Sequence, residues 1–205
     1  MTAHAATAHD AAAGAPPSLQ GAVGVHTQKL GMWVFLVSEV MFFTALIGSY
    51  IILRWGTNAQ WPEPRSVLAI PITAINTFIL ICSSVSMVKA YAAAVRDDQP
   101  GLKRWLLLTV LGGATFVSVQ AFEYHHLIEK GFLPSSGLFG ASFYTMTGFH
   151  GFHVTCGVLS MIWVTIQAFR GKYAGGRFQG IETIGLYWHF VDLVWIILFT
   201  IVYLI

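Results

Sequence analysis

Five long runs of apolar residues dominate this chain and leave it very few folds. They cover residues 30–53, 67–88, 105–122, 137–169 and 183–205. Each run can cross the hydrocarbon core of a bilayer as a helix, which takes roughly 20 residues. Lipid offers no hydrogen bonds to the backbone, so a chain must cross it as helices or as a closed barrel, whose strands are far shorter than these runs. The sequence therefore predicts an all-α, polytopic membrane protein with five transmembrane helices in a bundle.

The composition supports lipid as the main solvent of the chain. Hydrophobic residues make up 56% of it and charged residues only 10%, whereas soluble domains carry about 25% charged residues. The formal net charge of +2 gives no reason to expect a nucleic-acid partner. We divide the chain into a polar, Ala- and His-rich tail over residues 1–28 and one membrane domain over residues 29–205. The tail lacks an apolar segment after a basic start, so we do not expect a signal peptide.

Lysines and arginines near the ends of the runs predict the orientation. Cytoplasmic loops carry an excess of these residues. With the N-terminus inside, eight of them fall on the inner side and three on the outer side, so we predict an inner N-terminus and an outer C-terminus. The inner residues are Lys29, Lys89, Arg96, Lys103, Arg104, Arg170, Lys172 and Arg177, and the outer ones are Arg54, Arg65 and Lys130.

Ionisable residues inside the runs are the main candidates for function. Such groups are costly in hydrocarbon and usually face the protein interior or a functional path. At a rise of about 1.5 Å per residue, Glu39 lies about 4 Å and Asp192 about 3 Å from the centre of its run. His150 and His153 share one helix face, as do His189 and Asp192. We therefore expect His150, His153, His189 and Asp192 to form an interhelical polar cluster.

Three kinds of chemistry could explain these residues. Interhelical hydrogen bonding is favoured because Gly148, Gly151 and Gly157 allow close helix approach. Metal or haem ligation is a second interpretation, because bundles build such sites from facing helices. Di-iron bundles, however, use Glu-x-x-His pairs, and here only His189-x-x-Asp192 is similar, in reversed order. Proton relay is a third role of intramembrane carboxyls and imidazoles.

Two glutamates differ from the histidine pairs. Glu39 has no histidine on its own helix, and a carboxyl in hydrocarbon is more stable protonated unless it is paired. We take Glu39 as a candidate proton-linked residue, with a structural hydrogen bond as the alternative. Glu123 lies at the outer end of the third run, followed by His125 and His126. Adjacent histidines point in different directions on a helix, so we expect interfacial hydrogen bonds there rather than a metal site.

Five blocks carry a resemblance to a known family. They are Gly31–Phe43, Ile75–Thr77, Gln120–Tyr124, Thr147–His153 and Tyr187–Trp195. In content and order they resemble the subunit III family of haem-copper terminal oxidases, in its five-span form. The likeness extends from about Lys29 to the end of the chain.

The resemblance implies an accessory subunit of a proton-pumping cytochrome c oxidase, the enzyme that reduces oxygen to water. It implies no catalytic residue, metal site or cofactor in this chain, with the haems and copper in partner subunits. The chain would pack against subunit I and stabilise it, assemble with subunit II and other subunits, support proton uptake and bind phospholipid. Glu39 matches the family's intramembrane glutamate, and the histidines and Asp192 fall in two further blocks.

The chain departs from many members of that family, which have seven spans and hold lipid in a cleft beside the first two. Those two spans are absent here, so another subunit would have to complete the cleft. The five-span form favours a bacterial plasma membrane over a mitochondrial inner membrane. The alternatives are subunit III of a quinol oxidase, a self-contained haem or metal oxidoreductase, and an ion transporter, which the absence of internal repeats argues against.

Overall fold

The computed structural model describes residues 27–56, 61, 68–175 and 177–204. The polar tail predicted for residues 1–28 lies outside these ranges except for its last two residues. The described chain forms α1 (Thr27–Gly56), α3 (Ile70–Val95), α4 (Gln99–Glu129), α5 (Leu138–Phe169) and α6 (Gln179–Phe199), and α6 continues as a π-helical turn, η2 (Thr200–Leu204). These five helices are long and apolar enough to cross a membrane. The prediction of an all-α chain with five long apolar helices is confirmed.

Several helices extend beyond the apolar runs that predicted them. The largest difference is at the third run, where residues 105–122 were expected and α4 covers Gln99–Glu129. The apolar run ends at the first charged residues, but a helix need not end there. Lys, Arg and Glu are good helix formers, and their long side chains can reach the interface between membrane and water. Asp98 starts α4 by accepting a hydrogen bond from the Gly101 backbone N–H, and Pro100 lies in the first turn. A helix in a membrane can therefore continue past the hydrocarbon.

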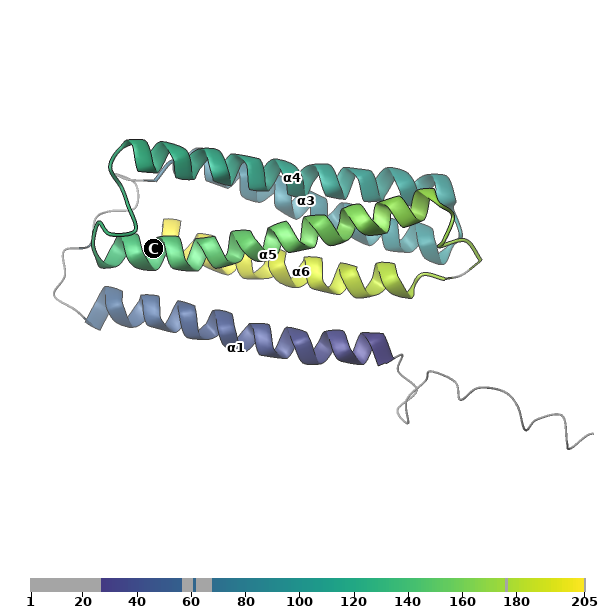
Figure 1. Cartoon of the computed structure of the whole chain (residues 1–205), viewed down its shortest axis with the longest axis horizontal. Helices are drawn as coiled ribbons and strands as arrows, with labels where there is room; N and C mark the ends of the chain where they lie inside the picture. The colour runs from purple at the N-terminus through teal and green to yellow at the C-terminus, as the bar shows by residue number, and fades with distance from the viewer. Residues whose placement is uncertain (1–26, 57–60, 62–67, 176, 205) are drawn as a thin grey trace, which may run out of the picture.

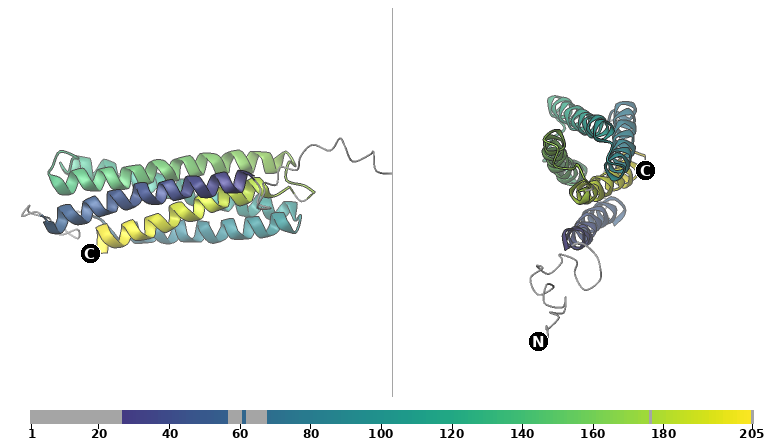
Figure 2. Two further views of the ribbon diagram at one scale, coloured as in Figure 1. Left: turned by 90° about the horizontal axis from the view of Figure 1, so that it is seen from below. Right: turned by 90° about the vertical axis from the view of Figure 1, so that its right-hand side faces the viewer.

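Four of the helices pack in a closed cycle, and α1 lies outside it. Neighbouring contacts join α3 to α4, α4 to α5, α5 to α6 and α6 back to α3, whereas α1 contacts mainly α6 and α5. The helices run side by side along the long axis (Figure 1). The end-on view in Figure 2 shows α1 against one side of the other four. The buried side chains of α1 are Leu36, Phe43 and Tyr50. They repeat every seven residues, so α1 is attached along a single narrow line.

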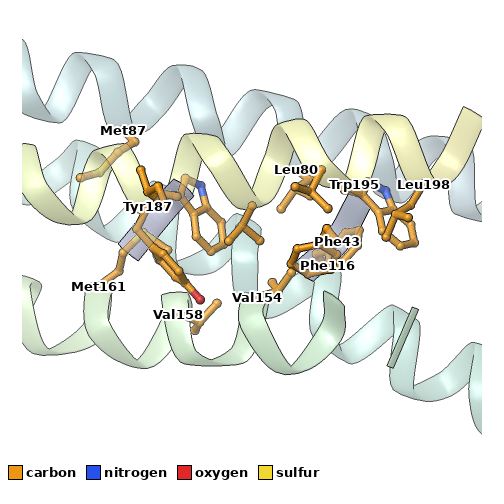
Figure 3. Packing of buried hydrophobic residues seen from close by; sticks show 14 of the residues in the cluster. Phe43, Leu80, Met87, Phe116, Val154, Val158, Met161, Tyr187, Trp195 and Leu198 are labelled. Atoms are coloured by element: carbon orange, nitrogen blue, oxygen red, sulfur yellow. The ribbon is translucent and has the colours of Figure 1, made fainter. Parts of the chain in front are cut away.

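Large aromatic side chains fill the interior of the four-helix cycle. Trp188 and Trp195 of α6 are almost completely buried, as is Phe116 of α4. Phe116 meets Trp195 edge to face with ring centroids 4.9 Å apart, and Figure 3 shows these rings together with Phe43. Trp188 fits because two glycines face it. A Cβ atom would lie 2.7 Å from Cη2 of Trp188 at Gly113 and 2.9 Å from its Cε3 at Gly157.

Two loops at one end of the bundle are joined through Asp97. This residue follows the C-cap of α3 and has φ at 56°, a left-handed conformation that glycine usually supplies just after helix C-termini. Its carboxylate accepts hydrogen bonds from Gln99 Nε2 at 2.7 Å and from the Gly175 backbone N–H at 3.3 Å. The α3–α4 and α5–α6 connections are therefore held together.

We predict that Gly157→Ala or Gly113→Ala destabilises the bundle by about 1–3 kcal/mol, because overpacking forces neighbouring side chains out of their preferred rotamers. The matched control is Gly48→Ala in α1, where an added Cβ would have no atom within 4 Å. The measurement is the temperature at which the detergent-purified protein loses its monodisperse size-exclusion peak. Equal temperatures for all three variants would contradict this account of Trp188 packing.

Candidate functional site

A carboxyl–imidazole pair joins α1 to α5 near the middle of both helices. Oε2 of Glu39 lies 3.0 Å from Nε2 of His153, and both side chains are largely buried. Nδ1 of His153 lies 2.7 Å from the carbonyl oxygen of Phe149. A carbonyl only accepts hydrogen bonds, so Nδ1 carries a hydrogen. The short contact between Nε2 and Oε2 then needs one further proton, either on the carboxyl or on the imidazole. The pair therefore holds one shared proton.

Neighbouring groups fix the orientation of the imidazole. The His153 ring lies with its centroid 5.1 Å from that of Phe43 and 6.1 Å from that of Phe42, both on α1. The Tyr187 hydroxyl of α6 donates to the backbone carbonyl oxygen of His153 at 3.0 Å. Three helices therefore meet at this pair.

The pair faces a groove, which we call the Glu39 groove. It has a volume of about 450 Å³ and lies between α1, α5 and α6. Its other lining residues are Met32, Phe35, Phe152, Cys156, Ser160, Ile184 and Tyr187. The side chains of His153 and Glu39 keep 13% and 15% of their surface exposed. Both side chains therefore border the groove near the middle of α1 and α5.

His150 occupies a different place from His153. It is fully buried, and its ring stacks on Trp195 with centroids 4.8 Å apart and planes at 25°. The Phe116 ring lies on another side of the imidazole, nearly perpendicular to it, with the two ring centroids 6.1 Å apart. Neither ring nitrogen has a hydrogen-bond partner among the described residues. His150 is therefore part of the aromatic core rather than of the pair.

His189 and Asp192 are placed on the α3–α6 contact. Nδ1 of His189 lies 2.7 Å from the Ser84 hydroxyl, and Asp192 lies beside the same serine. The four residues expected to form one interhelical cluster are thus divided between three places. His153 pairs with α1, His150 enters the core, and the other two meet Ser84 on α3.

Glu123 connects helices at the far end of the bundle. The Thr73 hydroxyl of α3 donates to its Oε1 at 3.1 Å, and the Tyr203 hydroxyl of η2 is 3.5 Å from the same oxygen. His125 and His126, by contrast, are exposed and lie within 4 Å of Glu129. Glu123 therefore contributes to packing between α3, α4 and η2.

Sequence reasoning missed several polar contacts. Lys29 and Glu182 form a 2.6 Å ion pair between the beginnings of α1 and α6. The Gln120 amide donates to the carbonyl oxygen of Thr147 at 3.1 Å, and the Tyr124 hydroxyl lies 2.6 Å from the Thr147 hydroxyl. The contacts among Gln120, Tyr124 and Thr147 could have been anticipated, because all three residues lie in the blocks that resemble the subunit III family. Nothing local in the sequence pointed to Ser84.

The geometry of these residues favours hydrogen bonding over ligation. Within the described ranges, no three His, Cys, Asp or Glu side chains gather closely enough to hold a metal ion. Both ring nitrogens of His153 already have partners. The arrangement can hold and exchange a proton at Glu39 and His153.

Comparison with known proteins gives a consistent match along most of the chain. The family model described as cytochrome c oxidase subunit III matches residues 18–205. A probable cytochrome c oxidase subunit 3 of Nocardia farcinica is 38% identical over 179 residues, covering 85% of this chain and 86% of the relative. Cytochrome c oxidase subunit 3 of Corynebacterium diphtheriae is 40% identical, covering 86% and 87%. The protein of that name from Synechocystis is 42% identical over 180 residues, covering 86% and 75%.

We predict that Glu39→Leu destabilises the bundle by about 1–3 kcal/mol, because it leaves Nε2 of His153 without a partner. Glu39→Gln should cost clearly less, because its amide can still donate to that nitrogen. Thermal loss of the monodisperse peak measures both, with Ser38→Ala as the control, since the exposed Ser38 hydroxyl bonds only to its own helix at the Phe35 carbonyl oxygen. Equal effects of Leu and Gln would contradict the shared-proton contact.

Proposed function

The chain belongs to the cytochrome c oxidase subunit III family, and from this we propose that it is a non-catalytic subunit of a proton-pumping respiratory oxidase. In this role it packs against subunit I and stabilises it, while the haems and copper reside in partner subunits. The chain is a multi-pass membrane protein, and the relatives named above come from bacteria. We place it in a bacterial plasma membrane with its N-terminus inside.

The Glu39–His153 pair is the observation that carries a proton-linked role. A carboxyl and an imidazole 3.0 Å apart share one proton near the middle of the membrane. The pair borders the Glu39 groove, so that proton can exchange without unfolding of the bundle. Intramembrane Glu and His residues that line such spaces commonly act in proton transfer. We assign this pair a supporting role in proton uptake by the complex.

Two grooves beside α1 support the proposed binding of phospholipid. One is the Glu39 groove. The other lies between α1 and α5, has a volume of about 250 Å³ and is lined mostly by apolar side chains, including Leu46, Leu53, Leu138 and Met146. The unbranched, apolar shape of an acyl chain suits both spaces. Lipid held there would fill the space that the narrow attachment of α1 leaves open.

The alternatives receive less support from the residues present. A self-contained haem or metal oxidoreductase would need free imidazole nitrogens facing a common space. His153 has both nitrogens engaged, and His150 is enclosed by Trp195 and Phe116. A quinol oxidase subunit remains the second candidate, because the electron donor binds to other subunits. The names of the relatives favour the cytochrome c enzyme.

The proposed function is tested by purification through a tag on this chain in mild detergent. We expect the dithionite-reduced minus oxidised spectrum of haem to accompany a large multi-span partner. After the chain is stripped away, the colour should stay with that partner, and the isolated chain should be colourless. If colour or metal follows the isolated chain, a catalytic centre lies here and the proposal fails.

We also predict the phenotype of Glu39→Gln in the assembled oxidase. The variant keeps the hydrogen bond to His153 but removes the exchangeable proton of the carboxyl. Haem content and the initial rate of oxygen reduction should match the wild type, while sustained turnover or proton uptake declines. Continuous oxygen-electrode traces, with Ser38→Ala as the control, measure this. Loss of the haem spectrum in Glu39→Gln would argue against an accessory role.

A further inference from the structure

A third groove lies on the other side of α6, between α3 and α6. We call it the His189 groove. It has a volume of about 190 Å³, and its lining includes Met87, Val88, Tyr91, Glu182, Gly185 and His189. The lack of a side chain at Gly185 leaves space at the base of the groove, because an added Cβ would lie 3.3 Å from Cε of Met87. The groove leads from the ion pair of Lys29 and Glu182 to His189.

His189 presents an incompletely satisfied polar group in this groove. Its Nδ1 contacts the Ser84 hydroxyl at 2.7 Å, but no described residue forms a hydrogen bond with its Nε2. The ring is only partly buried. The helical segment Gln179–Leu204 has 26 residues, so His189 lies about 4 Å from its midpoint. Neighbouring Asp192 is buried and also has one carboxyl oxygen, Oδ1, without a partner among the described residues.

Lipid alone cannot satisfy such a group at this depth. Acyl chains carry no donors or acceptors, and an unsatisfied polar group costs several kcal/mol in hydrocarbon. Hydroxyl groups elsewhere on the surface avoid this cost within their own helix. Ser118 and Thr155, for example, bond to the carbonyl oxygen four residues earlier. Nε2 of His189 has no such acceptor or donor among the described residues, so a polar group from a neighbouring chain would satisfy it.

We propose that a transmembrane helix of a partner subunit packs over the His189 groove and inserts a hydroxyl or carboxamide side chain at the level of His189. This inference rests on the proposed function, because membership of an oxidase complex supplies the partner. Interhelical hydrogen bonds to His, Ser, Thr, Asn and Gln are a recurring means of association in membranes. The contact with Ser84 orients the His189 ring. The space at Gly185 leaves room for a side chain of the partner helix.

Photo-crosslinking in the assembled complex tests which molecule lies in the groove. A photoreactive side chain at Val88, which lines the groove and is 53% exposed, is compared with one at Phe122 on α4, which is 70% exposed. We expect a protein adduct with a partner subunit from position 88 and at most lipid adducts from position 122. Only phospholipid adducts, or no adduct, from position 88 would overturn the proposal.

Substitution of His189 tests the hydrogen bond itself. His189→Leu should speed the loss of this chain from the complex during detergent washing about threefold or more, the range of one interhelical hydrogen bond. His189→Gln should largely restore retention, and Ser118→Leu on α4 should leave it unchanged. Unaltered retention of His189→Leu would overturn the proposal. If the wild-type chain is itself recovered without oxidase subunits, the proposed function fails instead, so the two failures are distinguishable.

Discussion

Hydrocarbon leaves polar side chains without partners, and this constraint accounts for most of the specific contacts in the structure. Many of the interior polar residues bond to their own helix or join two helices, and the buried His150, which stacks on Trp195, is an exception among the described residues. Asn76 donates to the carbonyl oxygen of Phe116, and the indole N–H of Trp195 donates to Thr77. Such bonds set which faces of the helices meet. The large aromatic rings then fill the space between the faces, and the glycines opposite Trp188 make room for them.

The number of helices could be predicted from the sequence, because a run of about 20 apolar residues has few alternatives in lipid. Partners could not. Spacing placed His150 and His153 on one face of α5, yet one stacks on Trp195 and the other reaches Glu39. Residues three apart on a helix differ in direction by about 60°, and that difference is enough to separate a core position from an interhelical pair. Ser84 was not anticipated because a serine in an apolar run gives no local signal.

The position of the Glu39–His153 pair also explains why the bundle tolerates a carboxyl at this depth. Glu39 lies on the only described helix outside the four-helix cycle, where a groove borders it. His153 belongs to the cycle and is held by Tyr187 and Phe149. The imidazole of His153, which is held in place, thus pairs with the carboxyl of Glu39 on α1, the helix with the fewest contacts to the others. This one bond carries much of the specificity with which α1 meets α5.

The attachment of α1 has a consequence for biosynthesis. Among the described helices α1 is made first, yet its main neighbours are α5 and α6, which are made after α3 and α4. His153 follows Glu39 by more than a hundred residues, so at usual elongation rates the carboxyl enters the bilayer about 10 s before its partner exists. During that interval α1 is a separate helix, and its carboxyl has not yet met the imidazole with which it pairs. The pair with His153 can form only after α5 has been made, and the contacts of α1 with α6 form later still.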